Sequence, residues 1–169
     1  MRIATLLLFT AILAISGFSQ TSLKVGASAP AFTATALDGT DYDLSELRGK
    51  VVVLTFWSTK CVICRSEIPT MNRFTDRFSK DKVVFLALTM ENEDKVEAFL
   101  TTNPFKFHIL PNSFGVVLQY ADRDREGNID MGFPSHFLIN QSGAIEYRAS
   151  GWDKTEKLNA ALNGLLSKQ

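Results

Sequence analysis

The sequence predicts an α/β sandwich with a mixed central sheet, because strand patterns alternate with helix patterns and a β-hairpin follows them. Two continuous apolar runs rich in β-branched and aromatic residues, 51–57 and 83–89, indicate buried strands. The segment between them, 61–79, has apolar residues near helical spacing and predicts a helix. Helices are therefore expected to cover the faces of a sheet that contains both runs.

Shorter patterns predict the other elements. The Asp-Gly pair at 38–39 is a turn signal, and Asn92 or Asp94 could cap a helix that runs to residue 100. The final helix is expected to begin at an Asp153 N-cap, because Glu156 three residues later completes a capping-box pattern. The remaining expectations are strands at 32–37, 107–110, 134–140 and 144–149, helical segments at 44–47 and 113–120, and a polar loop at 121–132.

The N-terminus has the composition of a secretory signal peptide. Arg2 is followed by a thirteen-residue stretch, 3–15, that is apolar apart from two threonines. The segment 16–19 offers small residues at −3 and −1 for cleavage near Ser19. A bilayer span takes about 20 residues, so this stretch is too short for one, although an uncleaved N-terminal anchor remains an alternative. We predict a signal peptide at 1–19 and one domain at 20–169, located in the periplasm or another extracytoplasmic compartment where disulfides persist.

The charge balance gives no sign of a strongly basic or acidic surface. The chain has 18 Lys and Arg against 18 Asp and Glu, and removal of Arg2 with the leader leaves 17 against 18. Nothing in this balance indicates nucleic acid or an anionic membrane surface as a partner.

The chain has two cysteines, Cys61 and Cys64, where the first buried strand passes into the predicted helix. The positive end of the helix dipole favours a thiolate on the first sulfur, and the thiolate is the reactive form. We therefore expect a redox pair, with Cys61 as the exposed nucleophile and Cys64 as the resolving thiol. The alternatives are a structural bridge, which over four residues would stabilise the fold by only about 2 kcal/mol, and a zinc site, for which His108 and His136 stand at no zinc-finger spacing.

Three neighbours of the cysteines fit the same chemistry. Lys60 adds a positive charge directly before Cys61, although a solvated surface lysine is the plainer interpretation. Glu67 lies one helical turn after Cys64 and could accept the proton of that thiol; a solvent-facing glutamate is the alternative. Pro134 opens a predicted strand, where a trans proline is the default but a cis proline would expose backbone groups for pairing with an extended substrate.

Five motifs together resemble the TlpA/ResA-like branch of the thioredoxin fold, over essentially the whole chain after the leader. They are G-x-x-A-P-x-F at 26–32, L-S-E-L-R-G-K at 44–50, V-V-L-x-F-W at 52–57, C-x-x-C-x-x-E-x-P at 61–69 and F-P-S-H-F-L-I-N at 133–140. The resemblance implies a thioredoxin-like three-layer sandwich, in which helices flank a central mixed sheet, with extra N-terminal strands. It also implies an exported thiol–disulfide oxidoreductase. Many proteins of this branch are reductases that serve cytochrome c maturation.

The resemblance assigns the site residues as well. It implies that Cys61 is the nucleophile and Cys64 the resolving thiol. It also implies that Glu67 is the active-site acid or base and that Pro134 is cis. The expected substrate contacts are Phe133, Pro134, Trp57 and Lys60. We expect a monomer that needs no cofactor beyond its disulfide, acts on the thiols or disulfides of exported proteins and receives electrons from a membrane thiol donor.

The chain departs from the family pattern in three places. Lys60 and Ile63 stand where Trp and Pro are common. Residues around the cysteines influence the reduction potential of the disulfide, so these two departures do not indicate the direction of electron flow. The reducing direction is favoured on the resemblance alone. Thr55 stands where thioredoxin has a buried aspartate, and Glu67 is therefore expected to carry the proton transfer alone. The third departure is the long loop before residue 133.

Two further groups are interpreted as structural. Residues 122–130 resemble the first nine positions of an EF-hand calcium loop, with glycine at the sixth position, but Phe133 occupies the place of the bidentate glutamate. The candidate calcium ligands are Asp122, Asp124 and Glu126. A solvated charged loop that touches a partner near the active site is the preferred interpretation. His136, two residues after Pro134, is interpreted as a packing residue.

Two other function classes remain open. A peroxiredoxin-like thiol peroxidase would suit the pattern at 26–57, but its attacking cysteine needs a threonine three residues earlier, where Cys64 has Cys61. Turnover of hydrogen peroxide separates the two functions. A non-enzymatic binding module on the same fold would make the disulfide incidental, so Cys61→Ser would then leave partner binding intact.

Overall fold

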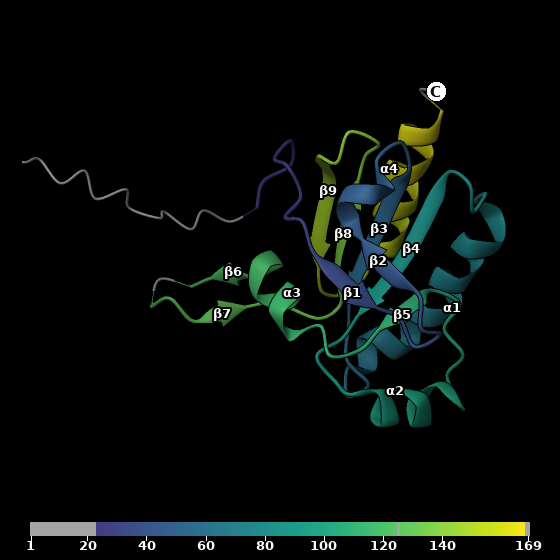
Figure 1. Ribbon diagram of the computed structural model, residues 1–169, viewed down its shortest axis with the longest axis vertical. Helices are drawn as coiled ribbons and strands as arrows, with labels where there is room; N and C mark the ends of the chain where they lie inside the picture. Colours follow the sequence, from purple (N-terminus) through teal and green to yellow (C-terminus); the bar gives the residue numbers. More distant parts are fainter. Residues whose placement is uncertain (1–22, 125, 168–169) are drawn as a thin grey trace, which may run out of the picture.

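The computed structural model describes residues 23–124 and 126–167, and the predicted signal peptide at 1–19 lies outside them (Figure 1). A five-stranded sheet in the order β5-β4-β3-β8-β9 forms its centre. The first three of these strands run parallel, and β8 and β9 join antiparallel. The strands are β3 (Val51–Phe56), β4 (Val83–Leu88), β5 (His108–Leu110), β8 (Ser135–Ile139) and β9 (Ile145–Ser150).

Helices cover both faces of this sheet. They are α1 (Val62–Arg77), α2 (Glu93–Leu100), α3 (Phe114–Tyr120) and α4 (Thr155–Leu166). Buried residues of α1, α2 and α4 share one apolar cluster with one face of the sheet, and α3 shares a second cluster with the other face. This is the three-layer, thioredoxin-like arrangement that the resemblance implies, and the predicted α/β sandwich is confirmed.

Alternation along β3 decides which side chains lie beneath α1. Val51 and Val53 belong to the cluster that contains α1, whereas Val52 and Leu54 belong to the cluster that contains α3. Successive side chains of a strand point to opposite faces, so Thr55 continues the first series. The odd-numbered positions of β3 therefore face the helix that carries the two cysteines.

An N-terminal hairpin adds to the face that α3 covers. Its elements are β1 (Thr33–Thr35), β2 (Asp41–Asp43) and the short 3-10 helix η1 (Leu44–Leu47). Gly39 has a φ of 80° in the turn between the strands, a conformation that glycine adopts without strain. Buried Phe32 and Leu44 join the second cluster. The extra N-terminal strands that the resemblance implies are therefore present.

The segment predicted as a polar loop at 121–132 forms a small hairpin instead. Its strands are β6 (Asp122–Arg123) and β7 (Ile129–Asp130), and Figure 1 shows them projecting beside α3. Asp124 shapes the turn, because its Oδ1 accepts hydrogen bonds from the backbone N–H groups of Glu126 and Asn128, at 3.0 and 2.8 Å. The prediction missed this hairpin because its strands are two residues long and mostly polar.

The predicted Asp153 N-cap is wrong. The helix α4 begins at Thr155, its N-cap position is Lys154, and no side chain caps it. Asp153 has a φ of 60° and takes part in the turn after β9, so it lies outside the extended backbone region that an N-cap residue uses.

No helix among the described residues is both long enough and apolar enough to cross a membrane.

Candidate active site

A disulfide joins Cys61 and Cys64 at the N-terminus of α1, with their Cα atoms 5.2 Å apart. Cys61 is the N-cap residue, and its Sγ accepts a hydrogen bond of 3.0 Å from the backbone N–H of Cys64. That N–H and the helix dipole would favour negative charge on the first sulfur once the disulfide is reduced. The helix start thus provides the electrostatic setting that the sequence predicted.

The two sulfurs differ in accessibility. Cys61 is half-buried, whereas Cys64 is only 5% exposed and belongs to the apolar cluster beneath α1. Val62 between them is 68% exposed, and Lys60 before them is also exposed. A partner molecule can therefore approach the first sulfur over an apolar surface, while the second is shielded by the sheet.

A largely buried carboxylate anchors the loop in front of the cysteines. Glu91, which follows β4, accepts hydrogen bonds of 2.7 Å from both the backbone N–H and the Oγ1 hydroxyl of Thr59, and one of 3.4 Å from Ser58 Oγ. Lys95 forms an ion pair with it at 3.2 Å. Burial alone would raise the pKa of Glu91, but the Thr59 hydrogen bonds and Lys95 lower it overall. Sequence reasoning missed Glu91, since 32 residues separate it from Thr59.

The Phe133–Pro134 peptide bond is cis, as the resemblance implied. Pro134 is buried, and its carbonyl oxygen accepts a hydrogen bond of 2.8 Å from the backbone N–H of Gly151. Among the described residues, none forms a backbone hydrogen bond with the N–H or C=O of Phe133. The backbone of Phe133 is therefore the part of this loop that can pair with an added extended segment.

Pro134 also lies next to the resolving cysteine. It lines a small cavity of about 10 Å³ together with Cys64 and Glu67. The sequence placed these residues in one site from separate motifs, and the fold brings them together around this cavity.

Glu67 has a buried partner that sequence reasoning did not give it. Its Oε2 lies 3.4 Å from Nε2 of His136, and Nδ1 of His136 lies 3.1 Å from Oγ1 of Thr55. His136 is 0% exposed and the side chain of Glu67 is 12% exposed. The interpretation of His136 as only a packing residue is therefore corrected, because its ring has hydrogen-bonding partners on both sides. Thr55, His136 and Glu67 form one hydrogen-bonded chain behind the disulfide.

The sequence did contain a signal for this hydrogen-bonded chain of three residues. Thr55 is the polar residue within the apolar run 51–57, and His136 interrupts the strand-like run before Asn140. A polar side chain in a strand buried on both faces needs a hydrogen-bonding partner. Two such residues on neighbouring strands would have been candidates for each other, but the pairing of those strands was not deducible from the pattern.

Trp57 does not present a surface to a substrate. It is 1% exposed, and its ring packs against Phe99 and Phe105 with centroid separations of 5.4 and 5.7 Å. Its Nε1 is buried without a hydrogen-bond partner among the described residues. The expectation that Trp57 contacts the substrate is therefore wrong. Trp57 instead supports the site from within, because it lines the small cavity next to Cys64.

The calcium interpretation of the segment 122–130 is not supported. Asp122 is held by the guanidinium of Arg148, with nitrogen–oxygen distances of 3.1 and 2.5 Å. Asp124 accepts hydrogen bonds within its own turn, including one of 3.0 Å from the side chain of Asn128. Among the described residues, no group of three His, Cys, Asp or Glu side chains could hold a metal ion.

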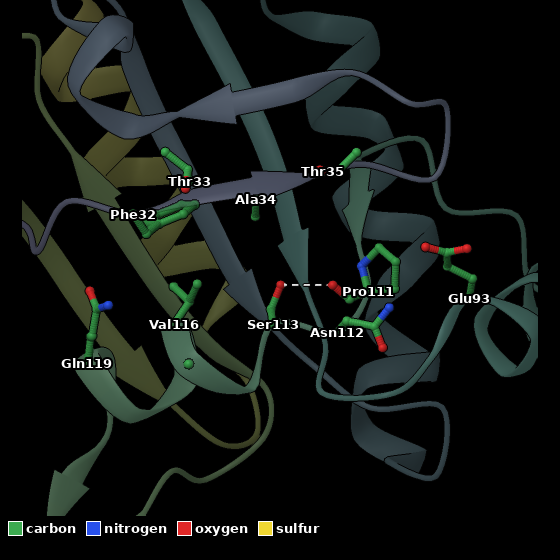
Figure 2. A pocket seen from close by; sticks show the side chains of 11 residues that line it. Phe32, Thr33, Ala34, Thr35, Glu93, Pro111, Asn112, Ser113, Val116 and Gln119 are labelled. Carbon is green, nitrogen blue, oxygen red and sulfur yellow. Dashed lines mark hydrogen bonds between the residues drawn. The ribbon is translucent and has the colours of Figure 1, made fainter.

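A cleft of about 570 Å³ lies away from the disulfide, between β1 and the turn that leads into α3. Figure 2 shows Thr33 and Thr35 on one side of it and Pro111 to Ser113 on the other, with the Ser113 hydroxyl bonded to the Pro111 carbonyl at 3.3 Å. The predicted site residues do not line this cleft.

Known proteins share both the sequence pattern and the fold. Residues 25–148 match the AhpC/TSA family. The thiol-disulfide oxidoreductase ResA of Geobacillus kaustophilus is 30% identical, and the alignment covers 98% of this chain and 94% of that protein. A crystal structure from Chlorobium tepidum, described as a candidate thiol:disulfide interchange protein DsbE, is 26% identical with a TM-score of 0.74, covering 86% of this chain and 99% of that one.

A secreted disulfide oxidoreductase of Mycobacterium tuberculosis shares the fold with a TM-score of 0.62 at 21% identity, over 79% of this chain and 96% of that one. The family match at residues 25–148 spans Cys61 and Cys64, which form the disulfide of this structure. This chain therefore belongs to the AhpC/TSA family and, within it, to the ResA-like thiol–disulfide oxidoreductases.

Proposed function

We propose that this protein is an exported reductase of disulfides in other exported proteins, with Cys61 as the nucleophile and Cys64 as the resolving thiol. The observation that supports this most directly is the difference in access between the two sulfurs. Cys61 is half-buried at the start of α1, whereas Cys64 is 5% exposed behind it. An incoming disulfide meets the first sulfur, and the second waits within the protein.

The reaction has two exchange steps. The Cys61 thiolate attacks one sulfur of the substrate, a Cys61–substrate disulfide forms, and the other substrate sulfur leaves as a thiolate that takes a proton from solvent. Cys64 then loses its thiol proton to Glu67 and attacks Cys61 Sγ. The internal disulfide forms, and the second substrate thiolate is released. Two electrons pass from the protein dithiol to the substrate disulfide, and a membrane thiol donor returns them.

The substrate is proposed to bind as an extended segment beside the cis-proline loop. The free backbone groups of Phe133 would pair with it, as strand addition requires. Exposed Val62 would give it an apolar surface, and exposed Lys60 would favour the Cys61 thiolate. These contacts are mainly to backbone, so they suit a range of polypeptide substrates.

The cellular setting is part of the proposal. The predicted signal peptide at 1–19 supports an extracytoplasmic location, where substrate disulfides persist. We place the protein there as a monomer, and the family resemblance suggests cytochrome c maturation as the process that it serves. Its charge balance supports neither a nucleic acid nor an anionic membrane surface as partner.

Mixed-disulfide trapping tests the function. Cys64→Ser is expected to leave exported proteins bonded to Cys61, because the second step is blocked. The matched control Cys61→Ser should trap none and should fail to reduce insulin. A reduction potential of about −270 mV would support a reductant, whereas one of about −120 mV would make the protein an oxidant. Rapid consumption of hydrogen peroxide that is lost with Cys64→Ser but kept with Cys61→Ser would instead identify a peroxidase.

A further inference from the structure

We infer that Thr55 and His136 are positioning residues that hold Glu67 and share the proton that it takes from Cys64 in the second exchange step. This inference rests on the proposed function and adds two residues to the site. The printed contacts connect Thr55 to His136 and His136 to Glu67, so both residues act through Glu67.

The pairing of the strands places the two residues together. Thr55 on β3 lies directly opposite His136 on β8 in the antiparallel register. Residues opposite each other in such a pair have side chains on the same face and close enough to interact. That face is the one beneath α1, where Glu67 stands one turn after Cys64. The chain Thr55–His136–Glu67 therefore runs from the sheet to the helix that carries the reactive cysteines.

The hydrogen-bonded chain of Thr55, His136 and Glu67 can exist in two protonation states that differ by one proton. With a neutral imidazole, Nε2–H donates to the Glu67 carboxylate and Nδ1 accepts from the Thr55 hydroxyl. With one proton more, both ring nitrogens donate, and the Thr55 oxygen becomes an acceptor. Because a hydroxyl serves in both directions, neither state leaves a buried ring nitrogen without a partner. The added proton is then shared between the carboxylate and the imidazole.

The surroundings keep that proton near Cys64. The small cavity at this point is lined by Thr55, Trp57, Met71, Phe105 and Pro134 in addition to the three titratable groups, which are Cys64, Glu67 and His136. Its volume of about 10 Å³ is at the lower limit for one water molecule. His136 is fully buried, whereas the side chain of Glu67 is 12% exposed. Glu67 is therefore the member of the chain through which a proton reaches solvent.

In the step itself, the Cys64 Sγ–H bond breaks and its proton passes to the Glu67–His136 pair. The Cys64 Sγ–Cys61 Sγ bond forms while the bond from Cys61 to the substrate sulfur breaks. The departing sulfur carries away the electron pair as a thiolate. The proton balance closes when the pair releases its proton through Glu67 to solvent or to that thiolate.

Stopped-flow reaction of the fully reduced protein with the aromatic disulfide DTNB separates the two steps. Attack by Cys61 releases the first aromatic thiolate at a rate that depends on DTNB concentration. Attack by Cys64 releases the second at a rate that does not. Thr55→Val removes the hydroxyl at similar shape and is expected to slow only the second phase, by about tenfold or more, as partial loss of general base catalysis would. Thr55→Ser keeps the hydroxyl and should restore the wild-type rate.

His136→Gln supplies the second readout. The amide can donate to Glu67 but cannot take up a proton, so the second phase should slow and lose the part of its pH dependence that the imidazole contributes. Unchanged second-phase rates and pH profiles in both Thr55→Val and His136→Gln would overturn the inference. Equal slowing of Thr55→Val and Thr55→Ser would also overturn it, because packing would then explain the effect. Failure of the wild type to show a first phase would count against the proposed function instead.

Discussion

The Glu91 carboxylate accepts a hydrogen bond of 2.7 Å from the backbone N–H of Thr59, two residues before the first cysteine. This contact ties the loop after β3 to the loop after β4, and the ion pair with Lys95 extends it to α2. Glu91 therefore fixes the loop that leads into Cys61 from outside the group of candidate catalytic residues.

Glu91→Gln is expected to lower the free energy of unfolding by about 2 kcal/mol at pH 7, because the Thr59 hydrogen bonds lose their charged acceptor and the ion pair with Lys95 is lost. The pKa of Glu91 is lowered in the folded protein from 4.5. Its contribution is therefore present above pH 4.5 and is lost as the pH falls through the lower folded value. Urea unfolding at pH 7 and pH 3 should show a gap between wild type and variant that narrows in acid. A gap of equal size at both pH values would contradict this, and Glu97→Gln on the exposed face of α2 is the control.

Tyr120→Phe should cost about 1–2 kcal/mol at pH 7, since the hydroxyl of this fully buried ring donates to the Pro30 carbonyl at 2.8 Å. Burial raises the pKa of Tyr120 well above its ordinary value of 10.0. The unfolded chain ionises this residue first, so the stability that Tyr120 contributes is present below pH 10 and declines as the pH rises above it. The gap between wild type and variant should therefore shrink in alkaline solution. Partly exposed Tyr42→Phe is the comparison, and a gap that widens in base would refute the assignment.

The pair of Arg148 and Asp122 links β9 to the β6–β7 hairpin, and the same guanidinium donates to the Leu23 carbonyl. Arg148→Lys should destabilise the protein by about 1 kcal/mol, because a lysine cannot reproduce the two-pronged contact. A double-mutant cycle with Asp122→Asn should give a coupling energy of similar size. Strictly additive effects of the two substitutions would show that the ion pair contributes nothing to stability.

Asn92→Ala should cost about 1 kcal/mol, because the Asn92 side chain accepts a hydrogen bond of 3.3 Å from the backbone N–H of Lys95 at the start of α2. The control Asn92→Asp keeps an acceptor at the cap and should remain close to wild type. Thermal unfolding monitored by circular dichroism is sufficient to separate them. Equal stability of all three proteins would show that α2 does not need its cap.

The elements that sequence patterns predicted well are those whose signals are local and repeated. The runs at 51–57 and 83–89 became β3 and β4 because a strand buried on both faces is apolar at nearly every position, Thr55 being the exception in β3. The helix after Cys61 followed from the spacing of its apolar residues. The two cysteines were identified as a pair from their spacing of three residues, which suits both a short disulfide and the first turn of a helix.

The features that escaped prediction depend on contacts between distant parts of the chain. His136 lies 81 residues from Thr55 and 69 from Glu67, so no local pattern joins them. The capping-box signal at Asp153 is local, but Asp153 adopts a φ of 60° after β9 and so does not cap the helix. A short-range preference of about 1 kcal/mol is readily overridden by tertiary packing of this kind.

The register between β3 and β8 limits how the chain can change in length. An insertion or deletion between Pro134 and His136 would rotate the imidazole to the side of the sheet that α3 covers, because neighbouring positions alternate. Opposite Leu138 and Ile139, β9 already accommodates an irregularity in its pairing. Loop grafts and insertions are therefore tolerable toward the far end of this hairpin, while the segment next to the proline must keep its number of residues.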